Sequence, residues 1–411
     1  MDTTEHHVSA NRAPIGFVEF VSLIAAMMAL TALGIDAMLP ALPAIGTSLD
    51  VAEPNHRQYI VTAFMLGFGV AMLAHGPLAD RYGRRPLLVV ALLGYAATNV
   101  LAAISGSFVL LLAARAASGA MIAGARTVSI AIVRDCFAGR AMARVMSLAF
   151  MVFMAAPILA PAFGEAVLAF ASWRWIFGGV AIVSTAILLW FVLRMPETLK
   201  PEERQPLDPR HIARGFRRVA SDRYAVGYTL AATAIQGSLF GFIGSIQQVM
   251  ADVFGRPHLL VIVFATVAST MAVGSFLNSR IVMRWGTRLI SHSALVGFIL
   301  FAAIHLALAL TGRETLTAFV IVQALMMACF ALAGANFSSM AMEHMGDIAG
   351  TAASVQGFVA VIGAALLGAF IGQSYDGTTV PLYTGFVLCG LVSLAIVAIA
   401  ERGRLFRPAA G

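Results

Sequence analysis

The chain has 411 residues, of which 60% are hydrophobic and only 11% are charged. A composition this apolar excludes an ordinary soluble protein and indicates a polytopic membrane protein. The net charge of +7 is carried by short segments between apolar runs and by no separate basic domain, which argues against a nucleic-acid-binding protein. Cys136, Cys329 and Cys389 lie in or beside apolar runs without metal-ligand spacing, so neither a disulfide framework nor a metal site is expected.

Twelve apolar runs of about 20 residues follow one another along the chain. Each is long enough to cross the hydrocarbon core of a bilayer as a helix, so we expect an all-α polytopic membrane protein with twelve transmembrane helices. Residues 1–16 are polar and the first apolar run is itself long enough to span, so no cleavable signal peptide is expected. The expected spans are 17–39, 58–79, 87–104, 108–132, 143–168, 174–193, 224–249, 258–279, 289–310, 315–339, 348–373 and 380–400.

A charged segment, GPLADRYGRRP at residues 76–86, separates the second and third runs. Its glycines permit close approach or a sharp turn, and its aspartate can accept hydrogen bonds from the neighbouring arginines. So much charge in so short a loop is hard to explain as connection alone. We therefore expect a conformational gate, with Asp135 after the fourth span as a facing acid. The residues of this gate are Gly76, Asp80, Arg81, Gly83, Arg84 and Arg85.

The same loop returns in altered form as NSRIVMRWGTR at residues 278–288. Aligning Gly83 with Gly286 places Arg85 on Arg288, whereas Asp80 falls on Met283. The repeat predicts two similar halves of six helices, residues 17–193 and 224–400. Only the first half is expected to keep the full set of loop charges.

The segment between the halves, residues 194–223, is the one sizeable polar stretch, and Pro196, Pro201, Pro206 and Pro209 interrupt any helix that enters it. Its later part, RHIARGFRRVASD, has the pattern of a basic amphipathic helix on the inner leaflet. We interpret the segment as a solvated cytoplasmic linker rather than a regulatory site. Lysine and arginine are concentrated on its side of the membrane, so the N-terminal tail 1–16 and the C-terminal tail 401–411 are both expected in the cytoplasm.

Several segments resemble known transporter sequences. GPLADRYGRRP is similar to the loop signature of the major facilitator superfamily, and it stands after the second span as in that family. Other segments resemble the drug:proton antiporters, especially the Bcr/CflA group of bacterial multidrug exporters. These are GIDAMLP at 34–40, RAASG at 115–119, AIVRD at 131–135, APILAPAFGE at 156–165 and RMPET at 194–198.

The resemblance implies a major facilitator fold, in which two pseudo-symmetric six-helix halves rock about a midplane cavity. It also implies a monomeric protein of the bacterial cytoplasmic (inner) membrane that exports lipophilic drugs or antibiotics in exchange for protons. Its expected partners are a small lipophilic substrate, protons and the lipid bilayer. Two alternatives stay open: a narrow-specificity metabolite exporter or proton symporter of the same fold, and a non-transporting membrane sensor.

No segment is left over for a soluble catalytic domain. HExxH, GxSxG and the nucleotide-binding glycine motifs are also absent from the sequence in suitable contexts. We therefore expect neither an enzyme nor an ATP-driven pump, and no cofactor.

Four ionisable residues lie well inside the predicted spans, and all belong to the first half: Asp36, Arg115, Arg126 and Glu165. Such residues are costly in a bilayer and usually face a cavity or a partner. Asp36 lies roughly 12 Å, and Arg115 roughly 7 Å, from the middle of its span toward the outer face, so the two can meet. Arg126 follows Arg115 by about three helical turns and points from the same face.

Asp36 is the first candidate for an exchangeable proton, because its charge depends on whether a dry site or Arg115 faces it. Its alternatives are a cap at the end of the first span before Pro40 and a permanent ion pair with Arg115. Arg115 would tune or replace the proton on Asp36, with snorkelling to the outer headgroups as its alternative. Arg126 either attracts an anionic or carbonyl-rich substrate or bonds carbonyls of neighbouring helices. Glu165 is either a second proton group or a water-exposed acid at the rim.

The second half offers uncharged polar groups instead. We expect three of them to form the substrate cavity together with Arg126, namely Gln236, Gln323 and Asn336. His75 and His305 lie in apolar spans and are expected to bond backbone carbonyls. In the fifth span, Pro157, Pro161 and Gly164 match the antiporter motif of the family, whose prolines bend the span and whose glycines let helices pack closely. Two glycines of that motif are replaced by Ala156 and Ala160.

Overall fold

The computed structural model describes residues 13–204 and 209–407. Most of the predicted N-terminal tail, four residues of the predicted linker and the end of the predicted C-terminal tail lie outside these ranges. Within them, every regular element is a helix.

Contacts divide the chain into two compact units. The first consists of Met1–Ala41 and Leu66–Asp208, and the second of Leu42–Met65 and Pro209–Gly411. The sequence-based boundaries at 17–193, 194–223 and 224–400 were drawn from membrane spans rather than from contacts, so they stay predictions.

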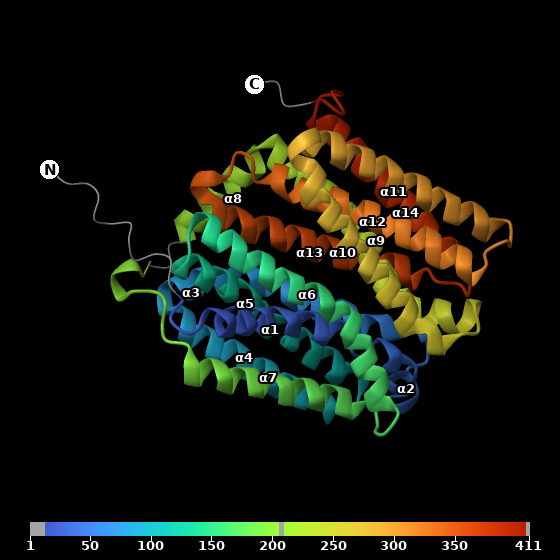
Figure 1. Cartoon of the computed structure of the whole chain (residues 1–411). Coiled ribbons are helices and arrows are strands. Elements are labelled where there is room, and N and C mark those ends of the chain that lie inside the picture. The colour runs from blue at the N-terminus through green and yellow to red at the C-terminus, as the bar shows by residue number, and fades with distance from the viewer. Residues whose placement is uncertain (1–12, 205–208, 408–411) are drawn as a thin grey trace. The chain divides into compact units, whose positions relative to one another are not determined.

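Six long helices occupy the first part of the chain (Figure 1): α1 (Phe17–Asp36), α3 (Tyr59–Tyr82), α4 (Arg84–Ala103), α5 (Phe108–Cys136), α6 (Gly139–Leu168) and α7 (Arg174–Arg194). Shorter helical segments connect or follow them: η1 (Leu39–Ala41), α2 (Leu42–Ser48), η2 (Pro54–Gln58) and η3 (Pro201–Glu203). The contact boundary between Met65 and Leu66 falls within α3.

The later part of the chain begins with the short α8 (Pro209–Ser221) and continues with six long helices. These are α9 (Arg223–Gln248), α10 (Leu260–Trp285), α11 (Thr287–Leu310), α12 (Leu316–Ala341), α13 (Ala349–Gln373) and α14 (Val380–Ala400). A π-helical turn η4 (Val249–Val253) extends α9, and the 3-10 turns η5 (Pro257–Leu259) and η6 (Gly346–Ile348) precede α10 and α13.

Twelve helices among the described residues are long and apolar enough to cross a membrane. This confirms the predicted all-α polytopic fold with twelve spans. Helices suit these segments because a helix pairs its backbone groups internally, which a bilayer core cannot do for them. Side-chain caps mark several starts: Ser107 accepts the Leu110 N–H before α5, and Thr315 accepts the Ala318 N–H before α12.

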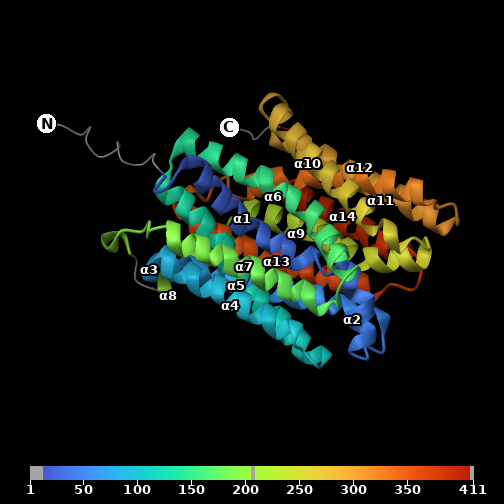
Figure 2. The same cartoon turned by 60° about the horizontal axis from the view of Figure 1, so that its bottom comes forward.

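The same packing pattern occurs in each unit. In the first, α1 packs on α5, α6 and α7, and α4 packs on α5 and α7 (Figure 1, Figure 2). In the second, α9 packs on α12, α13 and α14, and α11 packs on α12 and α14. Counting long helices from the start of each half, these are the same pairs, as the loop repeat predicts.

The predicted amphipathic helix corresponds to α8. Its Gly215 lies against Thr351 of α13, and its buried Val219 joins an apolar cluster with Met345 and Ala352. Arg217 and Arg218 are exposed. The apolar side of α8 is therefore covered by protein, and its basic side is exposed at the protein surface.

Candidate functional site

Asp36 is the last residue of α1 and is only 5% exposed. Within the described residues it makes no hydrogen bond or ion pair, and its Oδ1 is fully buried without a partner. Neither structural alternative for Asp36, a helix cap or a permanent pair with Arg115, is therefore present in this structure. A buried carboxylate is costly unless a cation or hydrogen-bond donors compensate for its charge.

Arg115 of α5 is completely buried next to the end of α1. Its Nη2 donates a 2.6 Å hydrogen bond to the carbonyl of Gly34, two residues before Asp36. Its guanidinium carbon lies 5.5 Å from the centre of the Phe177 ring. The structure thus brings the turn that carries Asp36 to Arg115, as the depths in the two spans predict, with a backbone carbonyl as the bonded group.

Two close helix contacts flank this pair. A Cβ on Gly164 of α6 would lie 1.8 Å from the carbonyl oxygen of Ala37, and a Cβ on Gly67 of α3 would lie 1.9 Å from that of Ala116. Only glycine allows backbones to approach this closely. Asp36 and Arg115 therefore each adjoin a residue that a neighbouring helix backbone holds in place. The motif predicted the packing role of Gly164, whereas no sequence signal singled out Gly67.

The other two intramembrane charges of the first half lie in different surroundings. Arg126 is half-buried on α5, with its guanidinium carbon 5.9 Å from the centre of the Phe68 ring. Glu165 is exposed near the end of α6, the position expected of a rim acid. Pro157 and Pro161 lie inside α6, where each removes a backbone N–H donor.

The loop between α3 and α4 is held by an ionic network. Arg84 is 3% exposed, and its guanidinium lies 2.6 Å from Asp80 Oδ1 and 2.9 Å from Asp135 Oδ2. Gly83, which precedes it, has φ = 104°, a conformation that favours glycine. Of the other predicted gate residues, Gly76 lies within α3, and Arg81 lies over the Tyr82 ring at 5.5 Å.

Glu197 is a member of this network that sequence reasoning missed. Its carboxylate accepts the backbone N–H groups of Arg84 and Arg85 at 3.0 and 3.1 Å. It also accepts the N–H groups of Thr198 and Leu199, both at 3.0 Å. A carboxylate at the start of α4 satisfies donors that the helix leaves free and complements its dipole. RMPET contains Glu197, but its position after the last span of the half gave no sign of contact with the loop.

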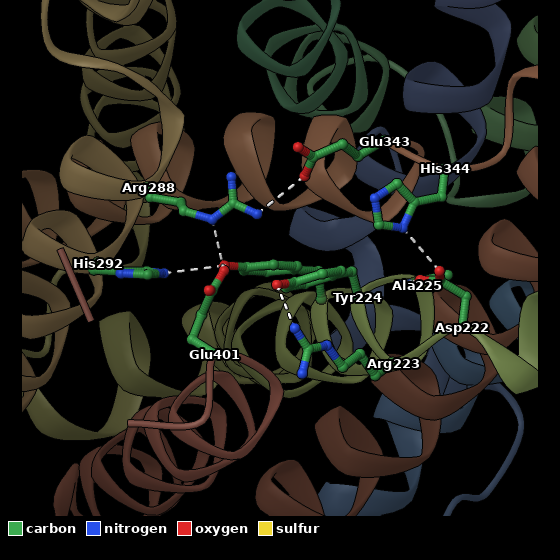
Figure 3. Close-up of polar contacts among 10 residues, drawn as sticks. Asp222, Arg223, Tyr224, Ala225, Arg288, His292, Glu343, His344 and Glu401 are labelled. Carbon is green, nitrogen blue, oxygen red and sulfur yellow. Dashed lines mark hydrogen bonds and ion pairs between the residues drawn. The ribbon is translucent and has the colours of Figure 1, made fainter. Parts of the chain in front are cut away.

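The second unit contains a comparable network around Arg288 (Figure 3). Arg288 is 6% exposed and lies 2.7 Å from Glu401 Oε1 and 3.1 Å from Glu343 Oε2. Gly286 before it has φ = 78°. The loop of this half keeps fewer charges than that of the first half, yet its arginine is paired with two carboxylates. The repeat loses its aspartate at Met283, but acids from beyond α12 and α14 supply the negative charge.

A chain of hydrogen bonds extends this network. The Tyr228 hydroxyl donates to Glu401 Oε1 at 2.5 Å and lies 3.2 Å from His292 Nε2. The backbone N–H of Phe406 donates to His292 Nδ1 at 3.1 Å. Because Nδ1 accepts, a neutral His292 ring carries its proton on Nε2. The residues after α14 are thus tied to α9 and α11.

Asp222 closes the start of α9 beside this network (Figure 3). Its carboxylate accepts the Ala225 N–H at 2.8 Å and lies 2.9 Å from His344 Nδ1. Burial alone would raise the pKa of Asp222, but these two donors outweigh it and hold the pKa below its ordinary value. Asp222 therefore stays ionised as a helix cap.

The three polar residues expected in a substrate cavity occupy separate places in the second unit. Asn336 donates to Asn278 Oδ1 at 2.7 Å and to the Leu332 carbonyl at 2.8 Å. Gln323 is completely buried and accepts a 3.3 Å hydrogen bond from Tyr383. Gln236 is half-buried on α9.

A small hollow in the second unit has room for about one water molecule, with a volume of about 10 Å³. None of the predicted cavity residues lines it. Its walls come from Leu42–Met65, α9 and α13: Gln58, Val61, Thr62, Met65, Phe240, Gly244, Ala365, Gly368 and Ala369.

Uncharged side chains join Leu42–Met65 to the rest of the second unit. Gln58 donates to Gln248 Oε1 at 2.6 Å and to the Gly372 carbonyl at 3.1 Å. Gln248 donates in turn to Asn55 Oδ1 at 2.8 Å, and Gln373 donates to the Asn55 carbonyl at 2.7 Å. We call Asn55, Gln58, Gln248 and Gln373 the amide cluster. It lies at the end of α9 opposite Tyr228.

Comparison with known proteins identifies the family. Residues 24–368 match the family model described as the Major Facilitator Superfamily. The chain is 29% identical over 383 residues to a bicyclomycin resistance protein homolog of Haemophilus influenzae, covering 91% of this chain and 94% of that one. It is 26% identical over 385 residues to the multidrug resistance protein MdtL of Klebsiella pneumoniae, covering 90% and 93%.

A solved structure shares the fold. It is a bacterial homolog of the human lysosomal transporter Spinster in an inward-facing and occupied conformation. It matches with a TM-score of 0.69 at 15% identity and covers 95% of this chain and 98% of its own. Twelve spans, two similarly packed halves and a family match over most of the chain agree with one another. The chain belongs to the major facilitator superfamily, and it is a multi-pass membrane transporter of small molecules rather than an enzyme.

Proposed function

We propose that this transporter is a proton-coupled antiporter that exports lipophilic drugs or antibiotics, and that Asp36 binds the exchanged proton. The observation that carries the proposal is the Asp36 carboxyl, which is buried, bonded to none of the described residues and two residues from the carbonyl that Arg115 binds. Binding a proton removes the negative charge of such a group, and losing the proton creates a charge that Arg115 can compensate. The drug-resistance names of the two relatives support export of this substrate class.

Coupling then follows because the proton and Arg115 compete to neutralise the negative charge of Asp36. A substrate that approaches both residues favours neutralisation by the guanidinium over the proton. The proton therefore leaves when the substrate binds and returns when the substrate is released. Arg126, half-buried about three helical turns after Arg115 on α5, is the proposed cationic contact for the substrate. Each proton that crosses 100 mV supplies about 2.3 kcal/mol. This energy supports a substrate gradient of more than about tenfold.

The proposed location is the bacterial cytoplasmic membrane, with both termini in the cytoplasm and the protein a monomer. The distribution of lysine and arginine between the segments supports this orientation. The Arg84 network then lies on the cytoplasmic side. Its proposed role is to stabilise one access state, since a contact shifts a conformational equilibrium only if it forms in one state and breaks in the other.

The test is uphill transport in proteoliposomes with an imposed pH gradient, followed with a fluorescent lipophilic cation such as ethidium. Asp36→Asn should abolish concentration of the dye against its gradient while leaving the protein correctly inserted, and Asp36→Glu should retain part of it. The matched control is Glu202→Gln, the same chemical change at an exposed acid, which should transport normally. Continued uphill transport by Asp36→Asn would refute the assignment of the proton.

A fourth variant decides the role of Glu165. If Glu165 is a second proton group, Glu165→Gln should lower the number of protons exchanged per dye molecule. If it is an exposed rim acid, the ratio should equal that of the unmodified protein.

A further inference from the structure

His305 and Glu314 form a buried titratable pair that the proposed cycle does not use. His305 is completely buried near the end of α11, and Glu314 follows in the turn before α12 with its side chain 7% exposed. His305 Nδ1 lies 3.4 Å from Glu314 Oε1. The expectation that His305 bonds a backbone carbonyl is therefore wrong, whereas His75 lies 2.8 Å from the Ala71 carbonyl as expected.

The pair is enclosed by aromatic rings. Tyr383 of α14 stacks on His305 with ring centres 3.9 Å apart and planes within 5°, and Phe319 of α12 meets the ring edge-on at 5.7 Å. Neither ring nitrogen of His305 has a hydrogen-bond partner among the described residues. The Thr379 hydroxyl, at the start of α14, donates to Glu314 Oε2. One carboxyl oxygen is therefore fixed by a hydroxyl, and the other is turned toward the imidazole.

Among the described residues, the side-chain ion pair and hydrogen bonds of His305 and Glu314 are with each other and with the uncharged Thr379. Tyr383 is the titratable group that α14 presents, and α12 presents the uncharged Gln323, which is bonded to Tyr383. Arg313, beside Glu314 in the chain, is exposed. The ionisable residues of α10, Arg280 and Arg284, lie at its other end, next to Gly286.

With this composition, the pair is electrically neutral when it holds one proton. It is neutral whether the proton sits on the carboxyl or forms an imidazolium beside a carboxylate. Removing that proton leaves a lone negative charge, and adding a second leaves a lone positive charge. Either state places an uncompensated charge among apolar groups, which is costly.

We propose that His305 and Glu314 form a site that binds one proton, separate from Asp36 and at the end of α11 opposite Arg288. Exchange with solvent runs through Glu314, since the residues before it, Thr311, Gly312 and Arg313, are exposed. The site lies beyond the proposed antiport at Asp36 and does not depend on it. In this proposal Gln323 belongs to the wall of the proton site, through its hydrogen bond with Tyr383, rather than to the substrate cavity.

The proton content of the pair determines how stability depends on pH. In an unfolded chain, an imidazole titrates near pH ~6.5 and a glutamate carboxyl near pH ~4.3. A folded pair that keeps one proton holds more protons than the unfolded chain above about pH 6.5, so stability falls as the pH rises there. If Glu314 were instead a permanently ionised anchor beside a neutral His305, the folded protein would hold fewer protons between about pH 4.3 and 6.5. Stability would then fall as the pH drops and would be level above that range.

The experiment compares reversible unfolding of the full-length protein with that of the double variant His305→Gln, Glu314→Gln in mixed micelles. Unfolding is followed by tryptophan fluorescence from about pH 5 to about pH 8.5, a range that brackets the imidazole titration. Relative to the double variant, the folding equilibrium constant of the unmodified protein should fall about tenfold per pH unit above pH ~6.5. A ratio that is level throughout, or that falls only below pH ~6.5, overturns the proposal.

Two further variants make the result specific. Glu343→Gln removes an acid that is paired with Arg288, an always-charged partner. The ratio of the folding equilibrium constant of the unmodified protein to that of Glu343→Gln should therefore be level above about pH 6.5. If the double variant fails to fold, Glu314→Gln alone replaces it. This change keeps an acceptor for the Thr379 hydroxyl, and the same tenfold trend above pH ~6.5 is expected, because a neutral His305 binds no proton there.

Discussion

The Arg84 and Arg288 networks occupy matching places in the two units, but only the Arg84 network includes an acid of its own loop, Asp80. Arg84 lies one residue, and Arg288 two residues, after a glycine with positive φ at the start of the third long helix of its half. Each network then takes one carboxylate from the end of the fourth long helix and one from beyond the sixth: Asp135 and Glu197 in the first unit, Glu343 and Glu401 in the second. The comparison shows that a spatial arrangement can repeat even though one loop lacks the acid of the other.

The two networks differ in how far water reaches the more buried acid of each. Asp80 and Glu343 have side chains that are similarly exposed, at 38% and 37%. The side chain of Asp135 is 13% exposed, whereas that of Glu401 is 7% exposed and also bonded to Tyr228. Water can solvate Asp80 and Asp135 when the arginine is lost, and it reaches Glu401 less. The second network should therefore be the more sensitive to loss of its cation.

The largest effect is expected for Arg288→Met, which leaves Glu401 buried without its cation. Breaking a buried pair from one side costs about 3–5 kcal/mol, so the folded yield and the thermal unfolding temperature should drop sharply. Adding Glu401→Gln to the same chain removes the stranded charge and should restore part of the loss. Equal instability of the single and double variants would show that the charge of Glu401 is not the cause.

A smaller effect is expected for Arg84→Met. The hydrogen bonds lost are worth about 1.5–3 kcal/mol, and the more exposed acids of this network can turn to solvent. The comparison is between the unfolding temperatures of Arg84→Met and Arg288→Met in the same detergent. If Arg84→Met proved the more damaging, exposure of the acids would not explain the difference between the networks.

Alanine substitutions at the two loop glycines should distinguish the cost of backbone strain from the cost of a steric clash. Gly83→Ala and Gly286→Ala each force a residue with a Cβ into positive φ, at about 1–2 kcal/mol. A Cβ on Gly83 would also lie 2.5 Å from Glu197 Oε2, whereas one on Gly286 has no atom within 4 Å. Gly83→Ala should thus be the less stable of the two in thermal unfolding. Adding Glu197→Ala should bring Gly83→Ala toward Gly286→Ala, and no change on adding it would contradict the collision.

The smallest effect is expected for Glu197→Gln. The amide keeps an oxygen for the N–H groups of Arg84, Thr198 and Leu199 and leaves that of Arg85 to solvent. It also removes the charge that complements the helix dipole, worth about 0.3–1 kcal/mol. The loss should shrink as salt is added, because salt screens this interaction. A deficit that is independent of salt would point to altered packing around Thr198 and Leu199 instead.

Sequence reasoning succeeded where chain length and local chemistry decide the outcome. The twelve spans follow from the length of the apolar runs, and the approach of Arg115 to the last turn of α1 follows from depth along two helices. It did not find Glu197, Glu343 or Glu401 as partners, because each lies after a helix end whose spatial neighbour no local pattern specifies. It did not relate Gln323 to Tyr383, because polarity in a span does not tell which helix face a side chain occupies.

The amide cluster has a consequence for the medium in which the protein works. Asn55, Gln58, Gln248 and Gln373 carry no charge and do not titrate, so the hydrogen bonds among them do not weaken with ionic strength. The Arg288 network at the other end of α9 is ionic, and salt screens the attraction between Arg288 and the partly exposed Glu343. The interactions of the amide cluster should therefore be equally strong at low and at high salt, whereas those of the Arg288 network should weaken as salt is added. With both termini in the cytoplasm as proposed, the Arg288 network responds to the ionic strength of the cytoplasm, whereas the amide cluster faces the outer medium and keeps its hydrogen bonds at any salt concentration there.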